Sequence, residues 1–460
     1  MQGLRDLRIV DFSDRIAGAY TTKLMADAYA EVIKVEPVDG DKLRSWTSSG
    51  QDLQGKDGAL FQFLNTSKKS VVGSMDDEHV DALLQGADLL VETSGGEMDA
   101  EALCERYPGL VVLSISDYGL GGPLTGTPAA DLTVQAHSGA ISVRGLQSQP
   151  PIMCGGRITE WIGGTFAAVA GLAAARRARA SGQGEHVDFS LCEVMNIGST
   201  TYLDLMDHMN GRPEPLGGPR SVELPSIEPT KDGWVGFNTN TNQQFTDFLL
   251  MIERPDLIAE TDWAIMGTRM AKMDEWNEIV RAWTTQHTTA EVVERASLLR
   301  IPVAPVNTGK TVFDHVHLKE RGVFKKNPTG GFLQPRPPYL LDGEGPRPFE
   351  AVPEVGEHQD SIESRKRPQP GIAPAVGQHP DLPLAGIRVI DTTAWWAGPS
   401  ACQMLAYLGA DVVKVEAIQR PDGMRMAGGV YISEPSWWER SAITLAANTN
   451  KRGITLNLTD

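Results

Sequence analysis

The sequence LRDLRIVDFSDRIAGAYTTKLMADAYAEVIKVE, residues 4–36, carries two strand-like runs separated by a helix-length segment. The first run is Leu7–Asp11 and the second is Glu31–Glu36, and an Ala-Gly turn opens the amphipathic stretch between them. This order predicts a βαβ unit, whose two strands are parallel. Strand-like segments at residues 88–92 and 109–115 extend the unit. We therefore predict an α/β fold in which a Rossmann-like parallel sheet is covered by helices.

The same pattern returns near the C-terminal end of the chain. Residues 384–416, LAGIRVIDTTAWWAGPSACQMLAYLGADVVKVE, match residues 4–36 at about eleven of thirty-three positions without a gap. After a shift of three, Asn448–Gly453 falls on Asn65–Ser70. This self-similarity predicts one whole unit and the beginning of a second. Residues 383–460 are too few to close a core of their own, so we expect either a longer natural protein or a tail that packs on another surface.

The chain is too long for one ordinary core, and its composition changes along the sequence. Residues 1–210 form the predicted large domain, in which helical periodicity places a long helix over Trp161–Ala180. From residue 211 the sequence becomes richer in Pro and Gly. A strand-like run and two helical stretches then predict a smaller α+β domain over residues 211–323; they are Gly233–Phe237, Asn242–Met251 and Glu275–Thr285.

Three further segments complete the predicted organisation. Residues 324–364 return to the large domain. Residues 365–382 are rich in Pro and predict an extended linker. Residues 383–460 begin the second, incomplete unit.

The charge of the chain narrows the range of partners. The formal net charge is -17, from 42 Lys and Arg against 59 Asp and Glu, which disfavours nucleic acid and anionic membranes as partners. The longest nearly apolar stretch, Gly163–Ala175, is shorter than the roughly 18–20 residues that span a bilayer. The charged N-terminus does not resemble a signal peptide. We therefore expect a cytoplasmic protein.

The sequence holds no pattern for a metal or a dinucleotide. The four cysteines lie far apart and outside any zinc-ligand spacing, which predicts free thiols; they are Cys104, Cys154, Cys192 and Cys402. The turn after the first predicted strand, Asp11–Gly18, lacks the G-x-G-x-x-G of dinucleotide-binding folds. We expect neither a metal nor NAD.

Ordered sequence blocks resemble the family III CoA-transferases, the group that contains formyl-CoA, carnitine-CoA and bile-acid CoA transferases. The opening block is Tyr29–Pro37 followed by Gly40–Arg44, and it returns at Gly409–Glu416. Further blocks follow in the expected order at residues 65–70, 114–123, 135–139, 182–188, 232–235 and 301–306. The resemblance covers almost the whole chain and implies the interlocked fold of that family.

The doubled arrangement is similar to fused family members, in which two transferase-like units form one chain. Ordinary members are interlocked dimers in which each chain threads through its partner. The resemblance therefore implies an interlocked homodimer or, with a full second repeat, a pseudo-dimer within one chain.

The resemblance also implies a reaction and a nucleophile. The family moves CoA between carboxylic acids, and a carboxylate, usually Asp, attacks the acyl-CoA thioester to form a covalent anhydride. The family places this residue about ten positions before a Gly/Ala-rich helix segment, here Val169–Ala175, and counting back gives Glu160. Glu160 has one more methylene than the usual Asp, and a carboxylate in a first helical turn can also be purely structural. Both interpretations stay open.

Contacts to CoA or acyl-CoA, bound as a substrate, are implied for ten residues. They follow the first and second predicted strands, the Asn-x-x-Lys block and the 88–92 segment: Arg15, Ile16, Ala17, Pro37, Arg44, Asn65, Lys68, Lys69, Thr93 and Ser94. Pro37 stands where the family often has Arg, and Thr93-Ser94 where Asn-Phe or Asn-Arg is usual. Lys68 and Lys69 are equally compatible with a solvated basic pair.

Two alternatives accompany the transferase hypothesis. In the first alternative, the first unit is a non-catalytic half of a fused transferase, which completes the architecture and shapes the pocket. The related α-methylacyl-CoA racemases need a His–Asp pair, but Ala130 stands in the place of the His before Asp131, which disfavours racemization. We therefore expect His137 to be a packed or hydrogen-bonded imidazole and not a base. The pairs Trp395-Trp396 and Trp437-Trp438 fit core or interface packing better than a substrate pocket.

Overall fold

A computed structural model describes residues 3–142, 144–145, 149–198, 224–239, 241–340, 343, 347–367, 381–426 and 435–457. Its contacts divide the chain into two compact units. The first comprises Met1–Ile141, Met153–Glu214 and Phe324–Asp460, and the second comprises Ser142–Ile152 and Pro215–Val323. The predicted boundary at residues 210 and 211 and most of the predicted linker, residues 368–380, lie outside the described residues. The predicted domain boundaries therefore stay a prediction.

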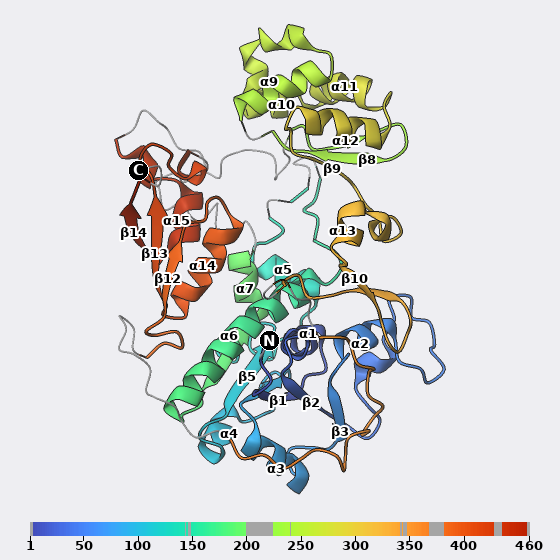
Figure 1. Ribbon diagram of the computed structural model, residues 1–460, viewed down its shortest axis with the longest axis vertical. Coiled ribbons are helices and arrows are strands. Elements are labelled where there is room, and N and C mark those ends of the chain that lie inside the picture. Colours follow the sequence, from blue (N-terminus) through green and yellow to red (C-terminus); the bar gives the residue numbers. More distant parts are fainter. Residues whose placement is uncertain are drawn as a thin grey trace. The chain divides into compact units, whose positions relative to one another are not determined.

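The first unit is built on a six-stranded parallel sheet (Figure 1). Its strands are β1 (Arg8–Phe12), β2 (Glu31–Glu36), β3 (Lys69–Val72), β4 (Leu89–Glu92), β5 (Val111–Ser116) and β6 (His186–Ser190). Their spatial order is β3-β2-β1-β4-β5-β6, so the chain reverses direction across the sheet between β1 and β4. The predicted α/β class and parallel sheet are confirmed.

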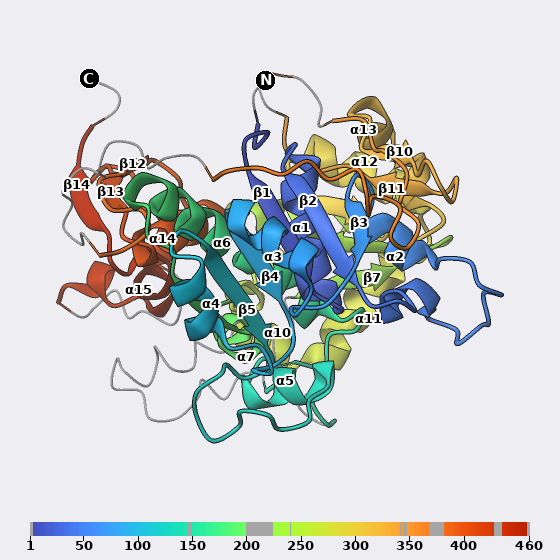
Figure 2. The same ribbon diagram turned by 90° about the horizontal axis from the view of Figure 1, so that it is seen from below.

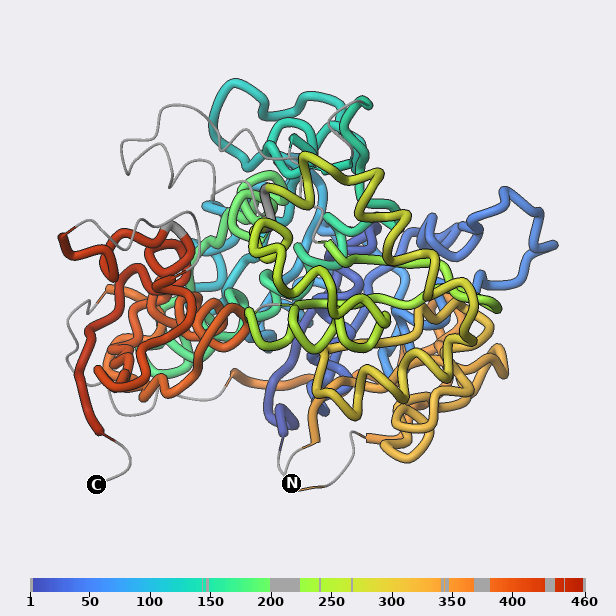
Figure 3. The backbone as a smooth tube through the Cα atoms, turned by 90° about the horizontal axis from the view of Figure 1, so that it is seen from above, coloured from blue at the N-terminus to red at the C-terminus, as the bar shows by residue number. Residues whose placement is uncertain are grey.

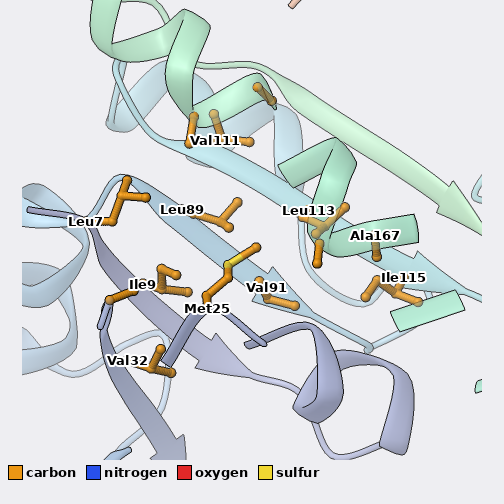
Figure 4. Packing of buried hydrophobic residues seen from close by; sticks show 14 of the residues in the cluster. Leu7, Ile9, Met25, Val32, Leu89, Val91, Val111, Leu113, Ile115 and Ala167 are labelled. Atoms are coloured by element: carbon orange, nitrogen blue, oxygen red, sulfur yellow. The ribbon is translucent and has the colours of Figure 1, made fainter. Parts of the chain in front are cut away.

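Helices cover both faces of this sheet, which explains why its central strands are continuously apolar. On one face α1 (Ile16–Asp27) and α6 (Ile158–Ser181) enclose a core in which Ile9, Met25 and Leu113 are fully buried (Figure 4). On the other face α3 (Glu78–Gly86) and α4 (Ala100–Arg106), seen from below in Figure 2, pack on Val10, Leu90 and their neighbours. The remaining helices of this part are α2 (Ala59–Leu64), α5 (Asp131–His137) and α7 (Leu191–Gly198).

Helix α6 is the longest helix of the described chain and ends where the sequence indicates. Its alanines favour a helix, and Gly182 adopts the left-handed conformation of a C-terminal cap with φ +77°. At 24 residues it is long and apolar enough to cross a bilayer, but 56% of its most apolar window is buried inside the fold. Gly164 lets α1 approach closely, since a Cβ there would lie 2.7 Å from the carbonyl oxygen of Ala17.

The chain returns to the first unit after residue 323. The strands β10 (Phe324–Lys326) and β11 (Leu333–Pro335) form an antiparallel pair. Residues 353–359 then run along the outer edge of β3, where His358 donates its backbone N–H to the carbonyl of Ser70 at 2.9 Å. Arg44 reaches the same segment and donates to the carbonyl of Pro353 at 3.0 Å.

The second unit carries a small antiparallel sheet and a helical layer. Its strands are β7 (Ile227–Pro229), β8 (Trp234–Phe237) and β9 (Val303–Pro305), in that spatial order. The helices are α9 (Asn242–Met251), α10 (Met266–Ala271), α11 (Met273–Thr284), α12 (Thr289–Leu298) and α13 (Val316–Glu320). Their core contains the fully buried Trp276 beside Phe245 and Phe248.

Residues 381–426 and 435–457 contain a three-stranded parallel sheet of their own, red in Figure 3. It contains β12 (Arg388–Asp391), α14 (Ala397–Tyr407), β13 (Asp411–Glu416), α15 (Ala442–Asn448) and β14 (Arg452–Thr455). The register pairs Arg388 with Asp411, just as Arg8 pairs with Glu31 in the first sheet. Figure 1 shows the same strand–helix–strand path in both places.

Candidate active site

Glu160 lies in the first turn of α6 and is buried, with 6% of the residue exposed. Its Oε2 accepts the backbone N–H of Ala17 at 2.8 Å, from the first turn of α1. Its Oε1 accepts from Arg15 at 2.9 Å. The carboxylate therefore accepts an amide donor from the N-terminus of α1 and lies near the positive dipole ends of α1 and α6.

Arg15 joins Glu160 to a second carboxylate. Its terminal nitrogens hold both oxygens of Asp117, which follows β5, at 2.8 Å each. Burial would lower the pKa of Arg15, but the hydrogen bonds and charges of Asp117 and Glu160 outweigh burial and raise it. The side chains of Arg15 and Asp117 are 27% and 22% exposed, whereas that of Glu160 is 7% exposed. The cluster thus meets solvent through Arg15 and Asp117.

Three of the predicted residues therefore come together at the carboxyl end of β1: Arg15, Ala17 and Glu160. Sequence reasoning missed Asp117 as a site residue. It lies inside the block Ser114–Gly119, which was read as a family motif, and only the fold brings it across to Arg15. Ile16 points elsewhere, into an apolar cluster with Leu43 and Phe61.

Lys68 and Asn65 form a separate, fully buried network. The Lys68 ammonium shares its three N–H groups among four acceptors: Asp11 at 3.0 Å, the Ala19 carbonyl at 3.0 Å, Thr22 at 2.8 Å and Asn65 at 2.9 Å. Burial lowers the pKa of Lys68 to about 8, although the charge of Asp11 acts in the opposite direction. All these partners belong to the chain itself, so the ammonium is committed to holding β1, α1 and the Asn-x-x-Lys turn together. The reading of Lys68 as part of a solvated pair is wrong, because its side chain is 0% exposed.

The remaining predicted CoA contacts have other partners than Glu160 or, in the case of Pro37, are exposed. Arg44 pairs with both oxygens of Glu36 and with Asp57 and lies over the Phe61 ring. Lys69 pairs with Glu31 at 2.7 Å. Pro37 is exposed directly after β2. Thr93 and Ser94 follow β4; Thr93 exchanges hydrogen bonds with Asp14, and Ser94 donates its N–H to Glu92. Their role toward CoA stays a prediction.

The residues weighed for racemase chemistry are also accounted for. Asp131 begins α5 and accepts from the backbone N–H of Thr159 at 3.3 Å and from Gln135 at 3.0 Å. His137 ends α5 and packs edge-on against Tyr118, with ring centroids 5.3 Å apart. Among the described residues, no group of three or more His, Cys, Asp or Glu side chains is placed to hold a metal ion.

The contacts around β12 and β13 repeat those around β1 and β2. Lys451 donates to Asp391, to the Pro399 carbonyl and to Asn448, as Lys68 does to Asp11, Ala19 and Asn65. Arg425 holds both oxygens of Glu416, as Arg44 holds Glu36. At the place of Arg15 this segment carries Trp395, which is 52% exposed.

Known proteins resemble the chain in sequence and in fold. The chain is 27% identical over 472 residues to a probable CoA-transferase, Rv1866, of Mycobacterium tuberculosis; the match covers 95% of this chain but 57% of that protein. It is 31% identical to the succinyl-CoA:mesaconate CoA-transferase of Haloarcula marismortui, covering 70% of this chain and 84% of the relative.

Solved structures agree in fold. A CAIB/BAIF family protein from Brucella suis superposes with a TM-score of 0.67 at 24% identity, covering 77% of this chain and 97% of that one. Rv3272 from M. tuberculosis gives 0.65 at 22% identity, with 78% and 99% coverage. The family model described as CoA-transferase family III matches residues 4–359 and again 384–460. The chain belongs to CoA-transferase family III.

Proposed function

We propose that this protein moves CoA between carboxylic acids, with Glu160 as the group that is acylated. The observation that carries the proposal is the position of Glu160: a buried carboxylate at a helix N-terminus, held by Arg15 and by the N–H of Ala17 at the carboxyl end of β1. Open parallel sheets bind their ligands at that end of the strands. The substrates named for the haloarchaeal relative are an acyl-CoA and an acid, which agrees with this reaction class.

In the proposed reaction the Glu160 carboxylate first attacks the donor thioester and then carries CoA. A Glu160 oxygen attacks the thioester carbonyl of the donor, the C–S bond breaks, and the CoA thiolate leaves an acyl–Glu160 anhydride. The thiolate then attacks the Glu160 carbonyl and releases the donor acid, so that CoA is carried on Glu160 as a thioester. The acceptor carboxylate repeats these two steps in reverse order and leaves as acyl-CoA. The protons and charges balance, because one carboxylate is consumed and one is released.

Arg15 has to move for this reaction to occur. Its guanidinium covers one Glu160 oxygen, but the side chain is 27% exposed and keeps its two bonds to Asp117. We propose that Arg15 turns with Asp117 as one pair when acyl-CoA enters, and that the Ala17 N–H keeps the other Glu160 oxygen in place.

Intact-protein mass spectrometry after incubation with succinyl-CoA, followed by peptide mapping, tests the nucleophile. We expect an adduct of the acyl group or of CoA on Glu160, and loss of both adduct and CoA exchange in Glu160→Gln. Glu193→Gln is the matched control, because Glu193 is an exposed glutamate in the first turn of α7 and should leave exchange unchanged. Exchange that persists in folded Glu160→Gln contradicts the assignment.

A second candidate is that residues 1–364 supply the non-catalytic half of a fused transferase. The feature that favours it is the saturation of Glu160 by Arg15 and Ala17, together with Glu in the place of the usual Asp. Glu160→Asp separates the candidates. A catalytic site keeps part of its activity, since a displacement of about 1 Å costs on the order of 100-fold in rate, whereas a structural carboxylate shows no effect on exchange at all.

We further propose that residues 384–460 begin a second transferase unit. The repeated contacts of Lys451 and Arg425 and the second match of the family model support this. The chain spans 57% of the length of its M. tuberculosis relative Rv1866. In this proposal the two units form the interlocked pair either within one longer chain or between two chains, and mass measurement of the natural protein distinguishes these forms.

A further inference from the structure

The outer edge of β3 is covered by residues of the chain's own return segment. Ser70 and Val72 turn their outer backbone groups toward it: the Ser70 carbonyl accepts from the N–H of His358 at 2.9 Å, and the Val72 N–H donates to the side-chain oxygen of Gln359 at 2.8 Å. The Gln359 amide nitrogen donates back to the Val72 carbonyl at 3.3 Å. Gly356, with φ +71°, passes so close that a Cβ would lie 3.1 Å from Val72. The edge strand is therefore closed.

The equivalent strand β14 has the same register, but no described residue pairs with its outer edge. Gly453 and Thr455 take the places of Ser70 and Val72, since Lys414 pairs with Gly453 and Lys34 with Ser70. Leu456 donates its N–H to the Glu416 carbonyl, as Gly73 does to Glu36, so the Thr455 N–H points outward. Among the described residues, no hydrogen bond reaches the outer backbone groups of Gly453 and Thr455. All four residues of β14 are exposed.

A cavity of about 630 Å³ lies beside this outer edge. Ile418 and Ile454, which are 79% and 42% exposed, line it together with Trp437, Trp438 and Arg425. Arg425 stands in the place of Arg44, whose guanidinium donates to the Pro353 carbonyl in the covered copy. The cavity therefore combines apolar surface with a strand edge that no described residue pairs, and it lies beside the Arg425 guanidinium, which donates to Glu416 and to the Trp438 carbonyl. Residues 353–359 meet the corresponding strand edge and guanidinium at β3.

We propose that the groove formed by β14, Ile418, Trp437, Trp438 and Arg425 binds an extended polypeptide segment with the chemistry of residues 353–359. Such a segment adds to the sheet edge through its main chain and through a side-chain amide like that of Gln359. A glycine at the position of Gly356 permits the close approach. This proposal does not depend on any reaction at Glu160.

Titration of the full chain with a synthetic peptide of residues 349–362 tests the proposal. The chain's own segment stays on β3 because it is tethered there, so we expect the peptide to bind the groove, to change the fluorescence of Trp437 and Trp438, and to slow amide exchange at residues 453–456. The matched control is the same peptide with Gly356→Val, which we expect to bind at least about tenfold more weakly.

Two variants of the protein identify the groove. Thr455→Pro removes an outward N–H and replaces one side chain of the cavity lining, which an edge strand tolerates, and Trp438→Ala opens the cavity wall. We expect each to lower peptide affinity about tenfold or more while circular dichroism stays unchanged. Four outcomes overturn the proposal: no binding at millimolar peptide, binding unchanged in both variants, peptide-dependent protection at residues 69–73 instead, or displacement of the peptide by CoA. Self-association of the chain that Thr455→Pro abolishes, with no peptide binding, would assign the groove to a second copy instead.

Discussion

At the scale of single residues, Lys68 is a charged side chain that is completely buried beside Asp11. Its ammonium has no contact with solvent and depends on one carboxylate, one carbonyl, one hydroxyl and one amide oxygen. Burial would raise the pKa of Asp11, but the charges of Lys68 and Lys34 and the hydroxyls of Ser13 and Thr22 hold it well below its usual range. The folded chain therefore keeps the Asp11 carboxylate charged, while it binds the Lys68 proton less tightly than the unfolded chain does.

This difference predicts how stability depends on pH. The pKa of Lys68 is about 8 in the folded chain, and that of an unfolded lysine is about 10.4. Between these values the unfolded chain binds more protons, so the free energy of unfolding should rise with pH, by roughly 1 to 3 kcal/mol from this group. The contribution is complete above the unfolded value and is lost as the pH falls through 8. Chemical denaturation at pH 8 and pH 10 measures it.

The double variant Asp11→Asn, Lys68→Met is the control for this pH dependence. It removes both charges of the pair, so a lower absolute stability does not affect the comparison of slopes. We expect a smaller rise between pH 8 and pH 10 than in the wild type. Equal slopes would show that Lys68 keeps an ordinary pKa.

Residue identity alone indicated only part of the site. Glu160 was implied by the family resemblance, from the position that the family's nucleophile takes before the Gly/Ala-rich helix segment, and the structure places it with Arg15 and Ala17. Asp117 lies 102 positions from Arg15 in sequence, and nothing in its own neighbourhood signals the pair. Lys68 was equally compatible with a CoA contact and with a solvated basic pair, but the structure buries its side chain completely, whereas the Lys69 side chain is 37% exposed.

At the scale of elements, the contact between α1 and α6 sets the geometry around Glu160. Gly164 and Ala17 meet along this contact, and the Thr21 hydroxyl shares its one hydrogen between the carbonyls of both. Because the Ala17 N–H also holds Glu160, any separation of the two helices changes the carboxylate's position. The packing of two helices is thus linked directly to the proposed chemistry.

Gly164→Ala should separate these helices. The added Cβ would lie 2.7 Å from the Ala17 carbonyl oxygen and 3.2 Å from Tyr20. Overpacking of this kind costs about 1 to 3 kcal/mol, against a gain of up to about 1 kcal/mol in helix propensity. We expect a lower thermal midpoint and a loss of CoA exchange beyond the loss of folded protein.

Gly155→Ala is the matched control, since a Cβ at Gly155 meets no atom within 4 Å. Its thermal midpoint and exchange activity should equal those of the wild type. A Gly164→Ala protein that is as stable and as active as this control would mean that α1 and α6 adjust without moving Glu160.

The sequence predicted the long elements well and the short ones poorly. The strand Glu31–Glu36 and the helix Asn242–Met251 occur with the predicted bounds, because each has a clear period and a clear end. The strand β3 was not predicted, since its four residues begin with Lys69 and Ser70 and the apolar run is too short to be distinctive. The strand β6 alternates polar and apolar residues at a sheet edge and was read only as a motif.

At the scale of the whole molecule, the dominant property is the negative charge. The formal net charge of the chain is -17 at neutral pH, and CoA carries several negative charges on its phosphates. Long-range repulsion between like charges slows association and is screened over about 8 Å at physiological ionic strength.

The contacts that return residues 353–359 to β3 span almost 300 positions, which is why composition could divide the chain but could not predict what covers that edge.

We expect the association rate of acyl-CoA to rise a few-fold as ionic strength increases from about 20 to about 200 mM, because salt screens this repulsion. Stopped-flow measurement with succinyl-CoA at several salt concentrations gives the slope. Succinyl-pantetheine lacks the nucleotide phosphates and should show a flatter response. A rate that falls with salt would reveal a local positive field at the entry site that outweighs the net charge.

The pairing of one guanidinium with two carboxylates leaves the Arg15 cluster with one more negative than positive charge when all three groups are ionised. Acylation of Glu160 would convert its anion into a neutral anhydride and leave Arg15 and Asp117 as an isolated, balanced pair. A neutral cluster costs less to keep away from water than an anionic one. Under the proposed mechanism, holding this cluster away from water would therefore cost more free energy in the resting protein than in the acylated one.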